Sequence, residues 1–224
     1  MAEPVVSAKK KPVVCVFCGA SMGNSPIHTE AARSLAHALH RAGVRLVYGG
    51  GTVGLMGEMA RTLVALAGPD SVHGIIPEPL VKLENNDPSS PSGHCITESI
   101  YGRTTIVEDM HTRKRLMVEE VIQGGLGGGF VALSGGYGTI EELMETTTWN
   151  QLEMHSMPIV AYSVDDYWSP LMSWIQHAVE NGFVKKENAG IIREAHDAEE
   201  VMEFLASHGV AKGELHGALA TSKL

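Results

Sequence analysis

Short apolar segments alternate with longer helical patterns along the chain, and this alternation limits the fold more than any other sequence feature. Each apolar segment spans only a few residues and leads through a turn into a stretch with helical spacing. Strands that alternate with helices predict a parallel sheet covered by helices, because each helix crosses back over the sheet between strands. The predicted strands are residues 13–17, 44–48, 72–76, 130–133 and 158–163, with a last short strand beginning at 191–192.

Two segments lack this periodicity. Residues 85–103 are rich in Asn, Asp, Pro, Ser and Gly, which predicts a loop. Residues 124–129 contain five glycines and one leucine, which predicts a flexible linker. The predicted helices cover residues 28–42, 55–67, 105–123 for most of its length, 139–152, 167–181 and 198–207.

Length and charge restrict the domain organisation and the partners. The 224 residues suffice for one α/β domain, expected at 13–208 between flexible tails at 1–12 and 209–224. A net charge of -9 argues against nucleic acid as the main partner. The apolar runs are all much shorter than the roughly 18 residues that span a membrane, so we expect no membrane partner. The first dozen residues lack the apolar core of a signal peptide.

The three cysteines and the last three residues bear on the compartment. Cys15 and Cys18 form a C-x-x-C pattern, but on a strand they point to opposite faces, so we expect buried structural cysteines. An odd, low cysteine count suits a reducing compartment. The terminal Ser222-Lys223-Leu224 matches the signal that the peroxisomal import receptor binds. We expect the peroxisome, with the cytoplasm as the alternative if this is an ordinary polar tail.

A glycine-rich loop follows the strand at 130–133. Its sequence, SGGYGTIEEL at 134–143, allows a tight turn and a close approach of the backbone to a ligand. The N–H groups at the start of the next helix favour an anion such as phosphate. Glu142 lies one turn into that helix, where a carboxylate suits chemistry on a phosphorylated molecule. The alternative is a capping box, in which Glu142 only satisfies the backbone at Thr139.

A second glycine loop, GGGTVG at 49–54, follows the strand at 44–48 and matches G-x-G-x-x-G. This pattern is typical of dinucleotide binding and makes a nucleotide-cofactor oxidoreductase an alternative. That function also requires an acidic residue at the end of the next strand, whereas Glu78 lies past Pro77. Gly51 could contact a ligand, or the glycines could serve packing alone. Both loops are expected at the same edge of the sheet.

The third element is a basic run within the helix predicted at 105–123. Met110, Arg113 and Met117 share one helix face, and a guanidinium beside an apolar face binds phosphate or carboxylate strongly. The alternative is a solvated basic face. The sequence contains no cluster with convincing metal-ligand spacing and no defensible catalytic Ser-His-Asp set.

Together, VCVFCGAS, LVYGGGTVGLMG, DMHTRK and GGYGTIEEL resemble the "lonely guy" family of cytokinin riboside 5′-monophosphate phosphoribohydrolases, often mislabelled lysine decarboxylases. The resemblance implies a Rossmann-like, three-layer α/β fold with a central parallel sheet. It implies a homodimer with active sites near the subunit interface. It also implies hydrolysis of an adenine-type nucleoside 5′-monophosphate to free base and ribose 5-phosphate, without a metal or redox cofactor.

The resemblance assigns the catalytic roles to Arg113 and Glu142. The family usually has proline where Ser134 stands, and residues 85–103 and 124–129 look enlarged in this chain. A non-catalytic carrier, resembling molybdenum-cofactor carrier proteins of related fold, remains the alternative, although a carrier needs no carboxylate beside a sugar. The residues expected to contact substrate are Gly51, Glu84, Met110, Arg113, Lys114, Gly135, Gly136, Tyr137, Gly138, Thr139, Ile140, Glu141 and Thr148.

Overall fold

The computed structural model describes residues 10–84 and 96–211. Its seven strands form one parallel sheet in the order β4-β3-β2-β1-β5-β6-β7. This confirms the predicted α/β fold with a central parallel sheet. The strands are β1 (Pro12–Phe17), β2 (Arg45–Tyr48), β3 (Val72–Pro77), β4 (Arg103–Val107), β5 (Gly125–Ala132), β6 (Ile159–Tyr162) and β7 (Ile192–Ala195).

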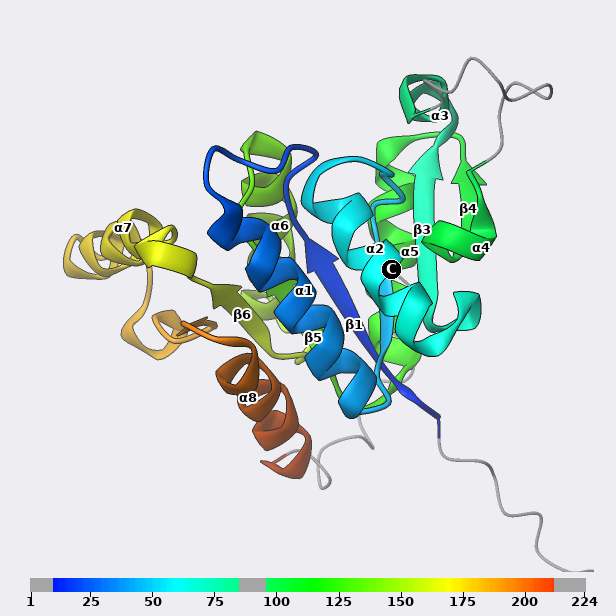
Figure 1. Cartoon of the computed structure of the whole chain (residues 1–224). Coiled ribbons are helices and arrows are strands. Elements are labelled where there is room, and N and C mark those ends of the chain that lie inside the picture. Colours follow the sequence, from blue (N-terminus) through cyan, green and yellow to red (C-terminus); the bar gives the residue numbers. More distant parts are fainter. Residues whose placement is uncertain (1–9, 85–95, 212–224) are drawn as a thin grey trace, which may run out of the picture.

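Helices cover both faces of the sheet (Figure 1). One face carries α1 (Pro26–Arg41), α2 (Gly54–Ala67) and α8 (Ala198–Ala211). The other carries α5 (Met110–Gln123), α6 (Tyr137–Gln151) and α7 (Ser169–Glu180). The short elements are α3 (Glu78–Glu84), α4 (Glu98–Tyr101), η1 (Pro69–Ser71), η2 (Val164–Asp166) and η3 (Lys186–Asn188).

The central strand β1 shows why the sequences of the strands are continuous apolar runs. Every residue from Val13 to Phe17 is buried, because helices pack on both faces of a parallel sheet. Cys15 belongs to the core under α5, α6 and α7, and Cys18 to the core under α1, α2 and α8. Both thiols are buried and free, which confirms that they are structural residues on opposite faces.

Strand β4 corrects two predictions. The sequence predicts a loop ending at 103 and a helix beginning at 105, but residues 103–107 pair with β3 along the edge of the sheet. Four consecutive β-branched residues, Thr104–Val107, favour this strand. The helix begins only at Met110, where the Asp109 carboxylate accepts a hydrogen bond of 2.8 Å from the N–H of Thr112. Helix α4 also lies inside the predicted loop.

The glycine run 124–129 is not a linker, and that prediction is wrong. Gly124 caps α5, and residues 125–129 form the first five residues of β5, which pairs with β1 through an irregular register. A Cβ added to Gly128 would lie 2.4 Å from the carbonyl oxygen of Val13. One added to Gly129 would lie 2.6 Å from a methyl group of Leu205. Glycine is therefore required here by close packing rather than by flexibility.

The regular elements extend slightly past the predicted domain bounds. Strand β1 begins at Pro12 and helix α8 runs to Ala211, so each enters a predicted tail. The tripeptide 222–224 lies outside the described residues, and its role as an import signal stays a prediction. Within the described ranges, no helix combines the length and apolarity needed to cross a membrane.

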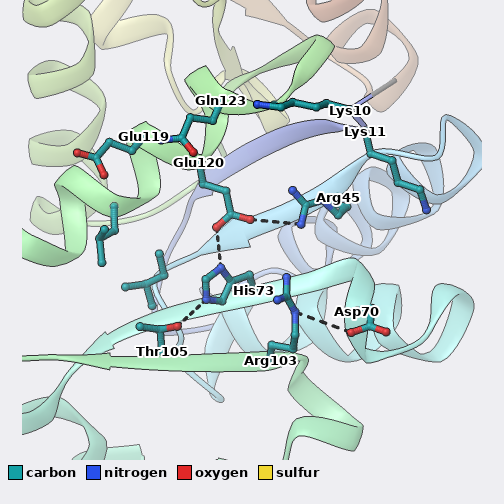
Figure 2. A pocket seen from close by; sticks show the side chains of 13 residues that line it. Lys10, Lys11, Arg45, Asp70, His73, Arg103, Thr105, Glu119, Glu120 and Gln123 are labelled. Carbon is teal, nitrogen blue, oxygen red and sulfur yellow. Dashed lines mark hydrogen bonds and ion pairs between the residues drawn. The ribbon is translucent and has the colours of Figure 1, made fainter. Parts of the chain in front are cut away.

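A polar cluster fastens α5 to the strands beneath it, beside an open pocket of about 920 Å³ near the amino ends of β2, β3 and β4 (Figure 2). The His73 ring lies 2.6 Å from the Glu120 carboxylate and 2.8 Å from the Thr105 hydroxyl. Arg45 lies 3.6 Å from the same carboxylate. Burial alone would raise the pKa of Glu120, but the hydrogen bond and charge of His73, with the nearby arginines, lower it. The interactions of this cluster therefore hold α5 against the sheet.

The lowered pKa of Glu120 predicts a pH-dependent contribution to stability. The contribution is present above the unfolded pKa of about 4.3 and is lost as the pH falls through the folded pKa. We expect Glu120→Gln to lower the free energy of unfolding by about 1 kcal/mol at pH 7 and by less near pH 3. Urea denaturation at both pH values measures this. Glu119→Gln is the matched control, since Glu119 pairs with Arg115 on the same helix. An equal loss at both pH values would contradict the prediction.

Candidate active site

The strand order reverses direction at β1 and β5, where ligands bind in open α/β sheets. Along the chain, β2, β3 and β4 are added on one side of β1, and β5, β6 and β7 on the other. The turns after β1 and β5 contact each other, because the N–H of Gly19 donates to the carbonyl of Ser134 at 3.0 Å. Open α/β sheets bind ligands in a crevice at the carboxyl ends of such strands, so this edge of the sheet is the expected ligand site.

The glycine loop presents the start of α6 at this edge of the sheet. The helix begins at Tyr137 with Gly136 as its N-cap, and no side chain caps it. Its first N–H groups are thus available to an anion, as the sequence predicted. A Cβ added to Gly136 or Gly138 would meet nothing within 4 Å, whereas one added to Gly135 would lie 2.0 Å from the hydroxyl oxygen of Thr139. The loop is therefore tightly packed at its base and open at its tip.

A buried ion pair lies at the centre of the site. Nη2 of Arg113, on α5, donates to Oε1 of Glu142, on α6, at 2.9 Å. The two residues are 8% and 7% exposed. The structure overturns the capping-box alternative, because the Glu142 carboxylate bonds to Arg113 and no side chain caps α6. Each charge compensates the other, because a single unpaired charge buried this deeply would strongly destabilise the fold.

One donor in the pair is left without a partner. The Nε of Arg113 is buried and has no hydrogen-bond acceptor among the described residues. An unsatisfied buried donor costs roughly 1–3 kcal/mol, and such costs are accepted at functional sites. An oxygen of a bound ligand would satisfy it. This donor therefore favours a ligand at the Arg113–Glu142 pair.

Burial also changes the acidity of Glu142. Desolvation raises its pKa above the ordinary value, and the charge of Arg113 opposes this only in part. A carboxylate with a raised pKa takes up a proton more readily near neutral pH than an exposed one. Glu142 is consequently suited to act as a general base.

Lys114 and Met110 support Arg113 from its own helix. The Lys114 ammonium bonds to Glu141 at 2.5 Å and to Glu145 at 3.0 Å, which ties α5 to α6. Nη1 of Arg113 donates to the Met110 sulfur at 3.6 Å. Both cationic side chains are buried, so the alternative of a solvated basic face is wrong for them.

The first glycine loop belongs to the same site, although its glycines serve packing. A Cβ added to Gly49 would lie 2.0 Å from Nη2 of Arg113. Gly50 has φ of 75°, and a Cβ there would lie 2.8 Å from Ile76. Gly51 is buried beside them. The loop therefore makes room for the guanidinium, which is a different role from the dinucleotide binding that the pattern alone allows.

The remaining predicted contacts lie at different distances from this pair. Thr139 is buried in the first turn of α6, and Ile140 and Glu141, which follow it, are exposed. Thr148 is exposed six residues beyond Glu142, roughly 9 Å along the helix. Its hydroxyl bonds to its own helix, so the structure does not bring it to the pair. Glu84 ends α3, and its side chain lies outside what the structure describes.

Two residues that hold the glycine loop were missed by the sequence analysis. His28 bonds to Ser134, 106 residues away in the chain, and Tyr167 bonds to Gly135, 32 residues away. Neither residue carries a local signal, because only the packing of distant segments brings it to the loop. In the described part of the chain, no three His, Cys, Asp or Glu side chains gather as metal ligands would.

The fold and the site together define a Rossmann-like α/β protein with a glycine loop beside a buried arginine–carboxylate pair. A family model described as "Possible lysine decarboxylase" matches residues 56–205. A probable cytokinin riboside 5′-monophosphate phosphoribohydrolase of Oryza sativa subsp. japonica is 40% identical over 87% of this chain and 79% of its own length. An Arabidopsis thaliana phosphoribohydrolase of the same description is 38% identical over 87% and 83%.

The chain belongs to this family of cytokinin riboside 5′-monophosphate phosphoribohydrolases, which confirms the resemblance that its motifs carry. A "Bifunctional cytokinin biosynthesis protein" of Fusarium pseudograminearum is 48% identical over 89% of the chain, which spans only 41% of that relative. Among solved structures, a molybdenum cofactor carrier protein of Chlamydomonas reinhardtii has a TM-score of 0.61 at 16% identity, covering 91% of this chain and all of its own. At that identity the likeness shows the fold alone.

The close approach of Arg113 to Gly49 predicts that a side chain at residue 49 destabilises the protein. A methyl group at residue 49 would push the guanidinium away from Glu142 and leave a buried carboxylate unpaired. We expect Gly49→Ala to lower the free energy of unfolding by about 3 kcal/mol, measured by urea denaturation. Gly190→Ala is the matched control, because a Cβ there meets nothing within 4 Å. Wild-type stability of Gly49→Ala would show that the guanidinium does not depend on this space.

Proposed function

We propose that the protein hydrolyses the N-glycosidic bond of cytokinin riboside 5′-monophosphates, and of AMP as a second candidate substrate, to give free base and ribose 5-phosphate. The observation that carries the proposal is the buried Arg113–Glu142 pair, with its unpartnered Nε, beside an uncapped helix start. The names of the relatives describe this same reaction.

The 5′-phosphate binds at the glycine loop in this proposal. The N–H groups from Gly136 to Thr139 surround the start of α6, where the helix dipole attracts an anion. The open space beside Gly136 and Gly138 accommodates the phosphate oxygens. Glu142 lies one turn further into the helix, so the sugar of a nucleotide bound this way extends toward the ion pair.

The chemistry follows from the charge that develops on the sugar. As the bond between C1′ and the base nitrogen breaks, oxocarbenium charge builds up at C1′. The Glu142 carboxylate stabilises that charge and takes a proton from the water that attacks C1′. The electron pair of the broken bond leaves with the base, which also takes up a proton. Arg113 anchors the nucleotide or assists the departing base, and Lys114 holds α5 against α6.

An assay with purified protein tests the proposal directly. AMP and isopentenyladenosine 5′-monophosphate are incubated separately, and free base and ribose 5-phosphate are followed by chromatography. Release of base from either substrate establishes the reaction, and the ratio of the two rates measures selection for the cytokinin side chain. Nucleotide binding without release would instead support a carrier.

Substitution of Glu142 is the sharpest test of the mechanism. We expect Glu142→Gln to preserve the fold and to lower kcat by about 10²- to 10⁴-fold, because the neutral amide neither stabilises the oxocarbenium ion nor accepts a proton. Circular dichroism checks the fold. Glu145→Gln is the matched control on the same helix, since Glu145 bonds to Lys114 rather than to Arg113. Normal turnover by Glu142→Gln would remove this carboxylate from the mechanism.

The carrier alternative rests on fold likeness alone. Carrier structures at 15–18% identity share the sheet and helices, and a fold of this kind serves many functions. A buried carboxylate paired with arginine favours catalysis, because holding a cofactor requires neither its raised pKa nor its position. Saturable binding of NAD or NADP would be needed to revive the oxidoreductase alternative.

We also propose that the protein is a homodimer with the interface beside the site. Large apolar side chains are exposed there: Tyr137 is 95% exposed, and Met110 and Ile140 are 40% exposed. A second subunit packed on α5 and α6 would bury them and exclude water from the site.

Light scattering after size-exclusion chromatography tests the dimer. We expect a mass of twice 24.0 kDa for the wild type. Ile140→Asp should give a monomer with at least tenfold lower turnover, because a buried unpaired charge opposes association. Leu126→Asp is a control, since Leu126 is exposed on β5 and lies outside these helices. A monomeric wild type with full activity would contradict the proposal.

A further inference from the structure

The base of the glycine loop is held by a side chain from the opposite layer of the fold. Ser134 is buried directly before the glycines, and its hydroxyl lies 2.9 Å from Nδ1 of His28. His28 is in the first turn of α1, whose apolar face packs into the core through Ala31, Ala32 and Leu35. The helix therefore presents His28 to the loop from a rigid position.

A second side chain holds the next residue of the loop. The hydroxyl of Tyr167 donates to the carbonyl of Gly135 at 2.5 Å. Tyr167 is followed by the buried Trp168, whose indole N–H donates to the carbonyl of Ala132 at 3.1 Å. The rings of His28 and Tyr167 meet edge to face, with centroids 5.8 Å apart. The two side chains thus form one clamp on consecutive loop residues.

The clamp restricts a loop whose glycines would otherwise leave its backbone flexible. Gly135, Gly136 and Gly138 leave the backbone many accessible conformations. The N–H groups at the start of α6 bind an anion well only if they are already aimed at one point, because ordering a loop on binding lowers affinity. Fixing the residues before the open tip restricts the loop while leaving room for the ligand.

We infer that His28, acting through Ser134, and Tyr167, acting through Gly135, are positioning residues that set the affinity of the site for the 5′-phosphate. The inference rests on the proposed function for the identity of the ligand. Neither side chain reacts with the substrate. Each holds the glycine loop in its binding conformation from a different layer of the molecule.

Positioning of the phosphate has a kinetic signature that simple destabilisation lacks. The phosphate is bound in both the ground state and the transition state, so a looser loop weakens both equally. We expect His28→Phe, Ser134→Ala and Tyr167→Phe each to raise KM about tenfold, with kcat changed less than twofold. The affinity for ribose 5-phosphate, measured by calorimetry, should fall by the same factor.

A double-mutant cycle shows whether His28 acts through Ser134. The double variant His28→Phe with Ser134→Ala should match either single variant, because both substitutions break the same hydrogen bond. Adding Tyr167→Phe to His28→Phe should raise KM further, because a separate bond is lost. His37→Phe is the control, since His37 is an exposed residue of the same helix. It should leave KM and affinity unchanged.

The outcomes separate this inference from the proposed function. If wild-type protein releases no base, the proposed function fails, and binding of ribose 5-phosphate to the variants still tests the clamp. Unchanged affinity in both His28→Phe and Tyr167→Phe would overturn the inference. A loss of kcat with unchanged KM would also overturn it, because the clamp would then act on the chemical step. Independent effects of His28→Phe and Ser134→Ala would show that His28 does not act through Ser134.

Discussion

The buried ion pair between Arg113 and Glu142 is the interaction on which the rest of the site depends. Taking two charges out of water costs several kcal/mol for each ion, and a well-packed apolar pair would stabilise the fold at least as well. The chain nevertheless places the pair between α5 and α6, with the guanidinium Nε unsatisfied. In the proposed function a bound ligand completes this arrangement, and the neighbouring elements are shaped around it.

Glycines shape the surroundings of this pair for two separate physical reasons. At Gly49 the missing side chain provides space, since a Cβ would collide with the guanidinium. At Gly136 and Gly138 it leaves the helix start open to an anion. The second arrangement needs an external restraint, because glycine alone does not define a conformation. His28 and Tyr167 provide it from elements that are themselves fixed by packing.

The comparison with carrier proteins shows why the site rather than the fold decides the function. The same sheet and helices occur in molybdenum cofactor carriers at low identity, and ligands gather at the same edge in any sheet of this topology. What favours hydrolysis here is a carboxylate whose pKa is raised by burial, one helical turn from the glycine loop where we propose that the phosphate binds. The pocket beside His73 lies near the other end of the strands. The side chains that line it pair with one another, as His73 does with Glu120, and these pairs hold α5 against the sheet.

The sequence by itself determined the parallel α/β class, the strand β1, both glycine loops and the basic helix, because burial and turn formation leave local patterns of apolar residues and glycines. It did not determine that 125–129 belong to a strand or that 103–107 pair with β3, because these depend on close packing and edge pairing with distant segments. Local pattern also left Glu142 open between cap and active-site residue. Only the tertiary structure excluded the cap and paired Ser134 with His28, since the partners of Glu142 and Ser134 lie 29 and 106 residues away, and spacing along a chain does not encode which distant side chains meet.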